Sequence, residues 1–138
     1  MNIKFVNYLK IREFMKRGFI SIGVPENDAE ICSDVLINSD LRGIDSHGIG
    51  RFKMYIDRIK ADIQLPITDW KIIKETPTTL LIDGGNGMGH VVSYNAMKMV
   101  ISKAKQYGMG SAAITNSTHF GLSLIHISEP TRLLSISY

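Results

Sequence analysis

The chain has 138 residues, the length of one domain, and its 44% hydrophobic and 21% charged residues are typical of a soluble globular protein. Sixteen Lys and Arg residues against thirteen Asp and Glu residues give a formal charge of +3. The basic residues form no block, so nucleic-acid binding has little support. One cysteine, Cys32, excludes an internal disulfide, and no apolar run has the length of a membrane span or signal peptide. We expect a cytoplasmic protein.

Two helices are predicted in the first 40 residues. Asn7 can cap the first, in which apolar side chains recur every three or four residues until Gly23 ends it. The positions of this apolar stripe are Ile11, Phe14, Met15, Phe19 and Ile22. Pro25 suits the first position of a second helix that runs to about Asp40 and carries acidic residues in its opening turn. Its inward positions are Ala29, Cys32, Leu36 and Ser39.

A third helix is predicted after the polar segment 42–51, because apolar side chains again recur at helical spacing. They are Phe52, Tyr55, Ile56 and Ile59. A connector around Pro66 then leads to a short buried strand from Thr78 to Ile82.

The order strand, helix, strand is predicted for the rest of the chain. A glycine-rich loop at 83–89 is followed by a long helix from His90 to Tyr107, which Gly108 ends, and by a strand from Met109 to Thr115. This order is typical of a βα crossover and places the chain in the α/β (α+β) class. We expect a helical subdomain over 1–65 and the start of a mixed α/β domain over 66–121.

The densest polar cluster consists of Arg42, Asp45, Ser46, His47 and Arg51. Histidine can transfer protons near neutral pH, and arginine offers two parallel donors to a carboxylate. If a helix begins at Ser46, His47 and Arg51 lie four residues apart on one face. A structural interpretation stays open, with Asp45 and Ser46 as helix caps and Arg51 as a solvated charge.

Two further segments carry candidate residues. His119 follows a predicted strand, and ligands tend to bind at the carboxyl ends of strands in α/β domains. The glycine loop suggests a phosphate cradle, but a dinucleotide fingerprint that starts at Gly85 would need glycine where His90 stands. A tight structural turn is therefore favoured, with His90 as a helix-start residue. No set of residues has metal-ligand spacing, and we expect no metal.

Several segments together resemble the malate/L-lactate dehydrogenase-like family of NAD(P)-dependent oxidoreductases. They are Asp40–Arg51 (DLRGIDSHGIGR), Tyr55–Ala61 (YIDRIKA), Glu75–Pro77 (ETP), Asp83–Gly89 (DGGNGMG) and Asn116–Gly121 (NSTHFG). The resemblance implies a non-Rossmann fold, NAD or NADP as cofactor, and hydride transfer to or from a 2-hydroxy acid such as malate, lactate or ureidoglycolate. It also implies a homodimer for the full-length protein.

The resemblance also implies roles for single residues. His47 would be the proton donor or acceptor at the substrate oxygen, with Ser46 beside it in a supporting relay. Arg51 would bind the substrate carboxylate. His119 matches a second histidine to which the catalytic role is also assigned within the family, so both histidines stay candidates.

The resemblance ends at Gly121. Residues 122–138 (LSLIHISEPTRLLSISY) resemble the in-frame translation of a sequencing-library adapter, so we expect a non-native tail and assign His126 no function. The chain would then be an amino-terminal fragment that is inactive alone. The alternative is a non-catalytic helical and α/β module that uses its helix faces for protein association.

Overall fold

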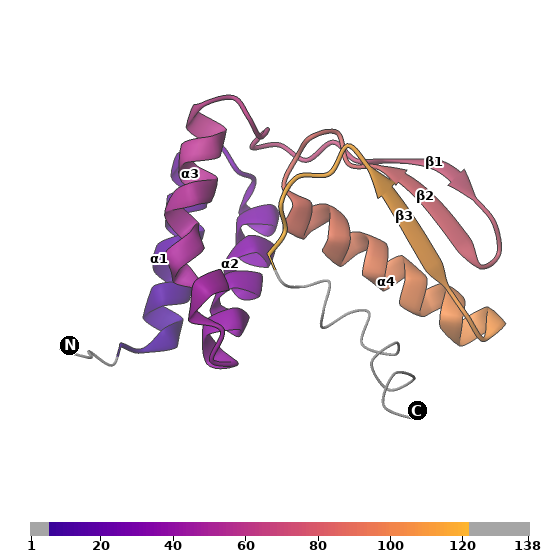
Figure 1. Ribbon diagram of the computed structural model, residues 1–138, viewed down its shortest axis with the longest axis horizontal. Coiled ribbons are helices and arrows are strands. Elements are labelled where there is room, and N and C mark those ends of the chain that lie inside the picture. The colour runs from indigo at the N-terminus through magenta and orange to yellow at the C-terminus, as the bar shows by residue number, and fades with distance from the viewer. Residues whose placement is uncertain (1–5, 122–138) are drawn as a thin grey trace.

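The computed structural model describes residues 6–121 and divides them between a helical part and a small sheet backed by a helix (Figure 1). The bounds are α1 Tyr8–Ser21, α2 Glu26–Leu41, the 3-10 turns η1 Asp45–His47 and η2 Ile49–Arg51, α3 Phe52–Lys60, β1 Lys71–Glu75, β2 Thr79–Asp83, α4 Gly89–Tyr107 and β3 Ser111–Thr115. The predicted tail at 122–138 lies outside the described residues. The mixed α/β class is confirmed.

The helices end where the sequence signals predict. The Asn7 side chain accepts a hydrogen bond from the backbone N–H of Leu9 at 2.9 Å, which satisfies an amide that has no partner within α1. At the C-terminal end of α4, Gly108 adopts a φ of 82°. A left-handed residue at this position closes a helix, and glycine adopts it without steric cost.

The sheet has the strand order β1-β2-β3 and mixed direction. β2 and β3 are parallel and joined through α4, which confirms the predicted crossover. β1 pairs antiparallel with β2, and it was not predicted. All five residues of β1 are exposed, so its sequence KIIKE lacks the alternation of buried and exposed side chains that marks a strand.

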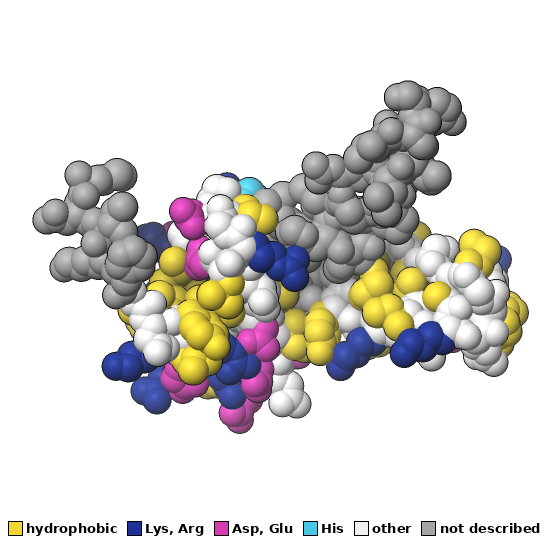
Figure 2. All heavy atoms as spheres, turned by 90° about the horizontal axis from the view of Figure 1, so that it is seen from below, with side chains coloured by type: hydrophobic (Ala, Val, Ile, Leu, Met, Phe, Trp, Pro, Cys, Tyr) yellow, Lys and Arg dark blue, Asp and Glu magenta, His cyan; other side chains and the backbone are white. Residues whose placement is uncertain are grey.

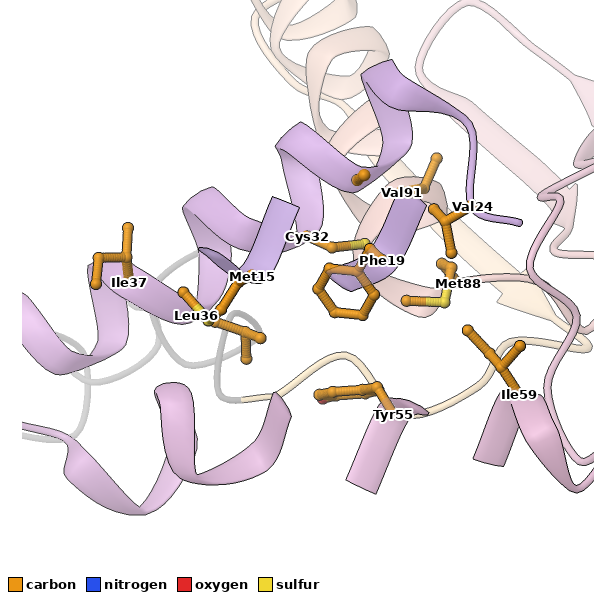
Figure 3. Packing of buried hydrophobic residues seen from close by; sticks show 11 residues of the cluster. Met15, Phe19, Val24, Cys32, Leu36, Ile37, Tyr55, Ile59, Met88 and Val91 are labelled. Carbon is orange, nitrogen blue, oxygen red and sulfur yellow. The ribbon is translucent and has the colours of Figure 1, made fainter. Parts of the chain in front are cut away.

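The main hydrophobic core lies between α1, α2 and α3, and the start of α4 closes it (Figure 3). Its buried members are Met15, Phe19, Val24, Ala29, Cys32, Leu36, Ile37, Tyr55, Ile59, Met88 and Val91. Met88 and Val91 come from beyond residue 65, so the helical part does not complete its core alone. The predicted domain boundaries stay a prediction.

A second, smaller cluster joins α4 to the sheet. Its buried members are Leu80, Ile82, Val92 and Ala96, and Trp70, Met99, Val100, Ala112 and Ile114 pack against it. The strand predicted to be buried, Thr78 to Ile82, provides Leu80 and Ile82. One burial prediction is wrong, since Phe14 on the apolar stripe of α1 is 61% exposed and meets the Phe52 ring edge to face, with centroids 5.7 Å apart.

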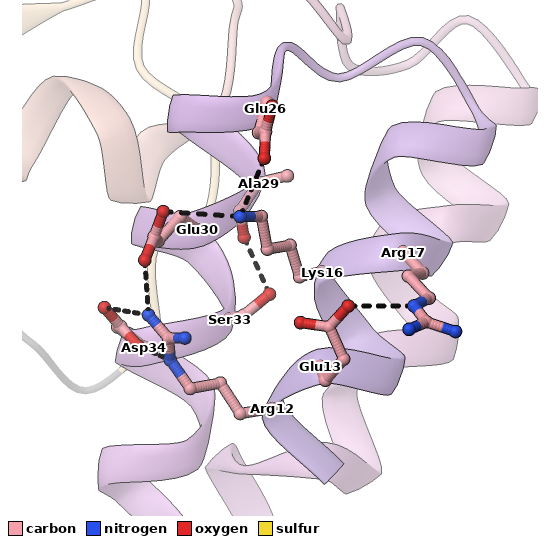
Figure 4. Close-up of polar contacts among 9 residues, drawn as sticks. All are labelled: Arg12, Glu13, Lys16, Arg17, Glu26, Ala29, Glu30, Ser33 and Asp34. Atoms are coloured by element: carbon pink, nitrogen blue, oxygen red, sulfur yellow. Dashed lines mark hydrogen bonds and ion pairs between the residues drawn. The ribbon is translucent and has the colours of Figure 1, made fainter. Parts of the chain in front are cut away.

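Ion pairs fix α1 against α2 on the outer side of the core (Figure 4). Arg12 pairs with Glu30 at 2.7 Å and with Asp34, and Lys16 pairs with Glu26 at 3.0 Å. The hydrogen bond from Arg12 lowers the pKa of Glu30, so this carboxylate stays charged over most of the pH range. The pairs orient the two helices whose other faces form the core.

Hydrophobic side chains reach the surface on both parts of the molecule. Figure 2 shows them on one face, interspersed with Lys and Arg. Ile63, Ile67, Ile73 and Met109 are each more than half exposed. Among residues 6–121, none of the helices has the length and apolar character that a membrane span requires.

Candidate functional site

The polar segment between α2 and α3 does not continue as one helix. The expectation that His47 and Arg51 lie on a shared helical face is wrong, because Gly48 separates η1 from η2 with a φ of −92° and a ψ of −136°. α3 begins only at Phe52. The two side chains are therefore placed by a broken turn and not by helical periodicity.

Asp40 at the end of α2 stabilises this break. Its carboxylate accepts a hydrogen bond from the backbone N–H of Ile49 at 2.8 Å and occupies the space beside Gly48. A Cβ added at Gly48 would collide with that carboxylate. A side chain at position 48 would therefore displace the Asp40 carboxylate, whose hydrogen bond holds the turn of Ser46 and His47 to α2.

The candidate residues in this turn contact one another. Ser46 Oγ lies 2.9 Å from Nδ1 of His47, so the hydroxyl fixes one side of the ring. The Arg51 Nε donates to the backbone oxygen of Ser46 at 2.8 Å, which brings the guanidinium back over the same turn. The two outer nitrogens of Arg51 have no partner among residues 6–121, and a planar carboxylate matches them.

His119 is brought to the helical part by the loop after β3. Its Nδ1 lies 2.7 Å from the hydroxyl oxygen of Tyr55 on α3, across 64 positions of sequence. The loop is held to the start of α4 by Thr118, which donates to the Gly87 oxygen at 2.6 Å and accepts from the Gly89 N–H at 3.1 Å. The carboxyl end of β3 thus delivers a histidine to the same region as α3.

Two arginines act on His119. Partial burial lowers its pKa most, and Coulombic interaction with Arg58, Arg51 and His47 lowers it further. Arg51 comes from the turn and Arg58 from α3, and both guanidinium groups are positively charged. A site of this sign favours an anion such as a carboxylate.

A third histidine lies behind this group. His90, the second residue of α4, is 1% exposed, and its ring packs at 67° to that of Tyr55 with centroids 4.7 Å apart. Neither of its nitrogens has a hydrogen-bond partner among the described residues. Burial lowers the pKa of His90 to about 3, so its ring is neutral at pH 7. The Tyr55 ring packs against it.

We expect the free energy of unfolding to decrease as pH falls from about 6.5 to 5. The folded pKa of about 3 lies below the ordinary value of 6.5, so between these values only the unfolded state binds the proton. The loss reaches about 2 kcal/mol at pH 5, at roughly 1.4 kcal/mol per pH unit. Urea unfolding at several pH values measures it. His90→Leu should flatten the slope, and equal slopes in both proteins would contradict this assignment.

The glycine loop does not fit a phosphate cradle. Each backbone N–H from 84 to 89 already has an acceptor within the protein. The acceptors are Thr115 O, Asp83 Oδ1, Asn116 O, Gly84 O, Thr68 Oγ1 and Thr118 Oγ1. A Cβ at Gly87 would also stand 2.7 Å from the Thr68 backbone. These glycines allow close packing of neighbouring segments, so the structural interpretation holds, and we assign no cofactor contact to the loop.

Other features of the described residues offer no second site of this kind. Residues 6–121 contain no group of three or more His, Cys, Asp or Glu side chains that could hold a metal ion. A cleft of about 570 Å³ between α2 and α4 is lined by Glu30, Asp34, Arg42, Tyr94 and Lys98, among others. It contains neither candidate histidine.

Sequence reasoning missed Tyr55, Arg58 and His90. Tyr55 was placed correctly on the inward face of α3, but only as an apolar residue. A buried tyrosine normally pairs its hydroxyl, so that position also signals a polar partner from elsewhere in the chain. Nothing in the sequence identifies that partner as His119, because the contact spans 64 positions.

Comparison with known proteins gives a consistent result. The malate/L-lactate dehydrogenase family matches residues 6–131. The chain is 50% identical over 101 residues to the L-sulfolactate dehydrogenase of Methanocaldococcus jannaschii, a match over 73% of this chain and 29% of the relative. It is 43% identical over 122 residues to the malate dehydrogenase of Pyrococcus abyssi, a match over 85% of this chain and 34% of the relative.

A solved structure extends the likeness to the fold. The crystal structure of malate dehydrogenase from Entamoeba histolytica aligns with a TM-score of 0.84 at 50% identity, over 87% of this chain and 34% of that one. The chain spans about a third of the length of the curated relatives it matches. The family match continues through residue 131, so it sets no boundary at Gly121.

Proposed function

The chain belongs to the malate/L-lactate dehydrogenase family, and from that premise we propose that the complete protein, at the length of its relatives, is an NAD(P)-dependent 2-hydroxy acid dehydrogenase. The observation that carries the proposal is that the loop after β3 brings His119 onto α3, the helix that directly follows the turn of His47 and Arg51. Relatives named for malate and for sulfolactate support a small acid as the substrate.

Each residue has a role that its position supports. Arg51 binds the carboxylate of the acid through its free outer nitrogens. His47, held at Nδ1 by Ser46, stands beside Arg51 and can exchange a proton with the C2 oxygen of the bound acid. His119 contacts the same oxygen from the opposite segment of the chain. Two histidines and an arginine thus satisfy both polar groups of a 2-hydroxy acid.

The nicotinamide, NAD or NADP, would supply or accept the hydride. The glycine loop offers no free N–H to a phosphate, and the chain spans about a third of the length of its relatives. We therefore propose that the rest of the complete protein makes most of the contacts to the cofactor and that the 138-residue chain is inactive alone. We also propose a cytoplasmic homodimer. The free, buried Cys32 supports a reducing compartment, and the exposed hydrophobic side chains support association.

The test of the function is an assay of the complete protein. We expect the complete protein to oxidise reduced nicotinamide when a 2-oxo acid is supplied. The acids to be tested, each with both cofactors, are the 2-oxo acids that correspond to malate, sulfolactate, lactate and ureidoglycolate. Arg51→Met should raise KM for the acid about 10- to 100-fold with little change in kcat, because a charge-assisted hydrogen bond is lost.

Arg17→Met is the matched control, since Arg17 is an exposed arginine on α1 whose only ion pair within residues 6–121 is with Glu13. It should leave KM unchanged. Absence of turnover with every acid and with either cofactor would overturn the proposed dehydrogenase activity. It would favour the alternative of a non-catalytic module for protein association. Turnover with an unchanged KM in Arg51→Met would instead overturn the role of Arg51.

A further inference from the structure

We propose that Tyr55 is a positioning residue that fixes the tautomer of His119, so that the ring presents an Nε2–H group and not a lone pair to the substrate. The inference rests on the proposed function for its meaning in catalysis. The tautomer itself follows from the hydrogen bonds of this chain.

The donors at Nδ1 decide the tautomer. The backbone N–H of Gly121 points at Nδ1 of His119 with a nitrogen–nitrogen distance of 3.2 Å. A backbone N–H can only donate, so Nδ1 must be an acceptor that carries no proton. The Tyr55 hydroxyl, 2.7 Å from the same nitrogen, is then the second donor. A neutral imidazole with a bare Nδ1 carries its proton on Nε2.

Tyr55 is well placed to enforce this arrangement. Its side chain is fully buried in the core of α1, α2 and α3 (Figure 3), and the His90 ring packs against it at 4.7 Å. Within residues 6–121 its hydroxyl has no other hydrogen-bond partner than His119. Burial raises the pKa of Tyr55, so the hydroxyl keeps the proton that it donates.

The other ring nitrogen of His119, Nε2, has no hydrogen-bond partner among residues 6–121, and the residue as a whole is exposed. Burial and the nearby cations lower the pKa of His119, which favours the neutral ring. A neutral ring with Nε2–H donates a hydrogen bond to a carbonyl oxygen but cannot take up a proton at that nitrogen. His47 is then the histidine that gains and loses a proton during turnover.

Nitrogen NMR of histidine-labelled protein tests the tautomer without any assay of activity. The chain has four histidines, and His119→Gln assigns the signal. We expect Nδ1 of His119 to resonate as an unprotonated nitrogen and Nε2 as a protonated one at pH 7.5. A protonated Nδ1 would overturn the proposal. If the 138-residue chain lacks dispersed amide signals, the same labelling and criterion apply to the complete protein.

Tyr55→Phe tests the part played by the hydroxyl. The variant keeps the buried ring and removes only the donor, and the tautomer ratio should shift about fivefold towards Nδ1–H, the equivalent of one neutral hydrogen bond. Tyr107→Phe, which removes a hydroxyl from an exposed side chain at the end of α4, is the matched control and should change nothing. An unchanged tautomer ratio in Tyr55→Phe would show that the Tyr55 hydroxyl does not fix the tautomer of His119.

Kinetics of the complete protein provide the second readout. Tyr55→Phe should lower kcat about five- to tenfold and leave KM for the acid unchanged, because Arg51 is not affected. A loss confined to KM would contradict a positioning role. If NMR shows the Nε2–H tautomer but the complete protein reduces no 2-oxo acid, the proposed function fails while the tautomer assignment stands.

Discussion

Phe19→Ala is expected to lower the free energy of unfolding by about 3–5 kcal/mol, the range for removing an aromatic side chain from a packed core. Phe19 is fully buried at the centre of the helical cluster, and its ring meets that of Phe52 edge to face with centroids 5.0 Å apart. The cavity would lie between three helices, two of which, α1 and α2, are joined by ion pairs, so collapse around it is limited.

Phe14→Ala provides the control on the same helix. Phe14 is 61% exposed and touches the same Phe52 ring from outside. Its removal deletes the same atoms but leaves no internal cavity, and the expected loss is about 1 kcal/mol or less. Urea unfolding of the three proteins measures both values. Equal losses at 14 and 19 would show that burial is not what separates the two positions.

This contrast also marks how far periodicity predicts the fold. The spacing of apolar residues located α1, α2, α3 and α4, and the signals Asn7 and Gly108 located two of their ends. Periodicity could not separate Phe14 from Phe19, because both lie on the apolar stripe. Which of them faces the core depends on where α3 crosses α1, and that is a tertiary property.

The missed strand has a different cause. β1 is recognisable only through its hydrogen bonds to β2, since both of its faces are exposed in the described residues. Its register against β2 shifts between Ile72 and Lys74, so Ile73 is an extra residue that interrupts the alternation of faces. Local sequence offers no alternation in such a segment, so only the pairing partner defines it.

The candidate site could be predicted as a set of residues but not as a geometry. The types and order of Ser46, His47, Arg51 and His119 indicated proton transfer and carboxylate binding. Their arrangement depends on a broken turn at Gly48 and on a contact between α3 and the loop after β3. The first is caused by the Asp40 carboxylate and the second joins distant segments, and neither follows from spacing.

Substitution of the two histidines should have the largest effect on activity. His47→Ala or His119→Ala in the complete protein is expected to lower kcat/KM about 10²- to 10⁴-fold, the usual contribution of a positioned acid or base. Neither ring is part of the hydrophobic clusters, so His47→Ala should change the free energy of unfolding little. His119→Ala leaves the buried Tyr55 hydroxyl without its partner and should cost about 1–3 kcal/mol. Steady-state kinetics and urea unfolding of each variant measure the two quantities separately.

Glutamine at the same positions separates the roles of the two histidines. A glutamine amide can still donate one N–H, so His119→Gln should retain much of the activity if His119 acts only as a donor, with a loss of about tenfold. A glutamine at 47 cannot exchange a proton, so kcat/KM of His47→Gln should fall as far as that of His47→Ala. The opposite order would make His119 the group that titrates, and full activity in both alanine variants would overturn the assignment of the site to this chain.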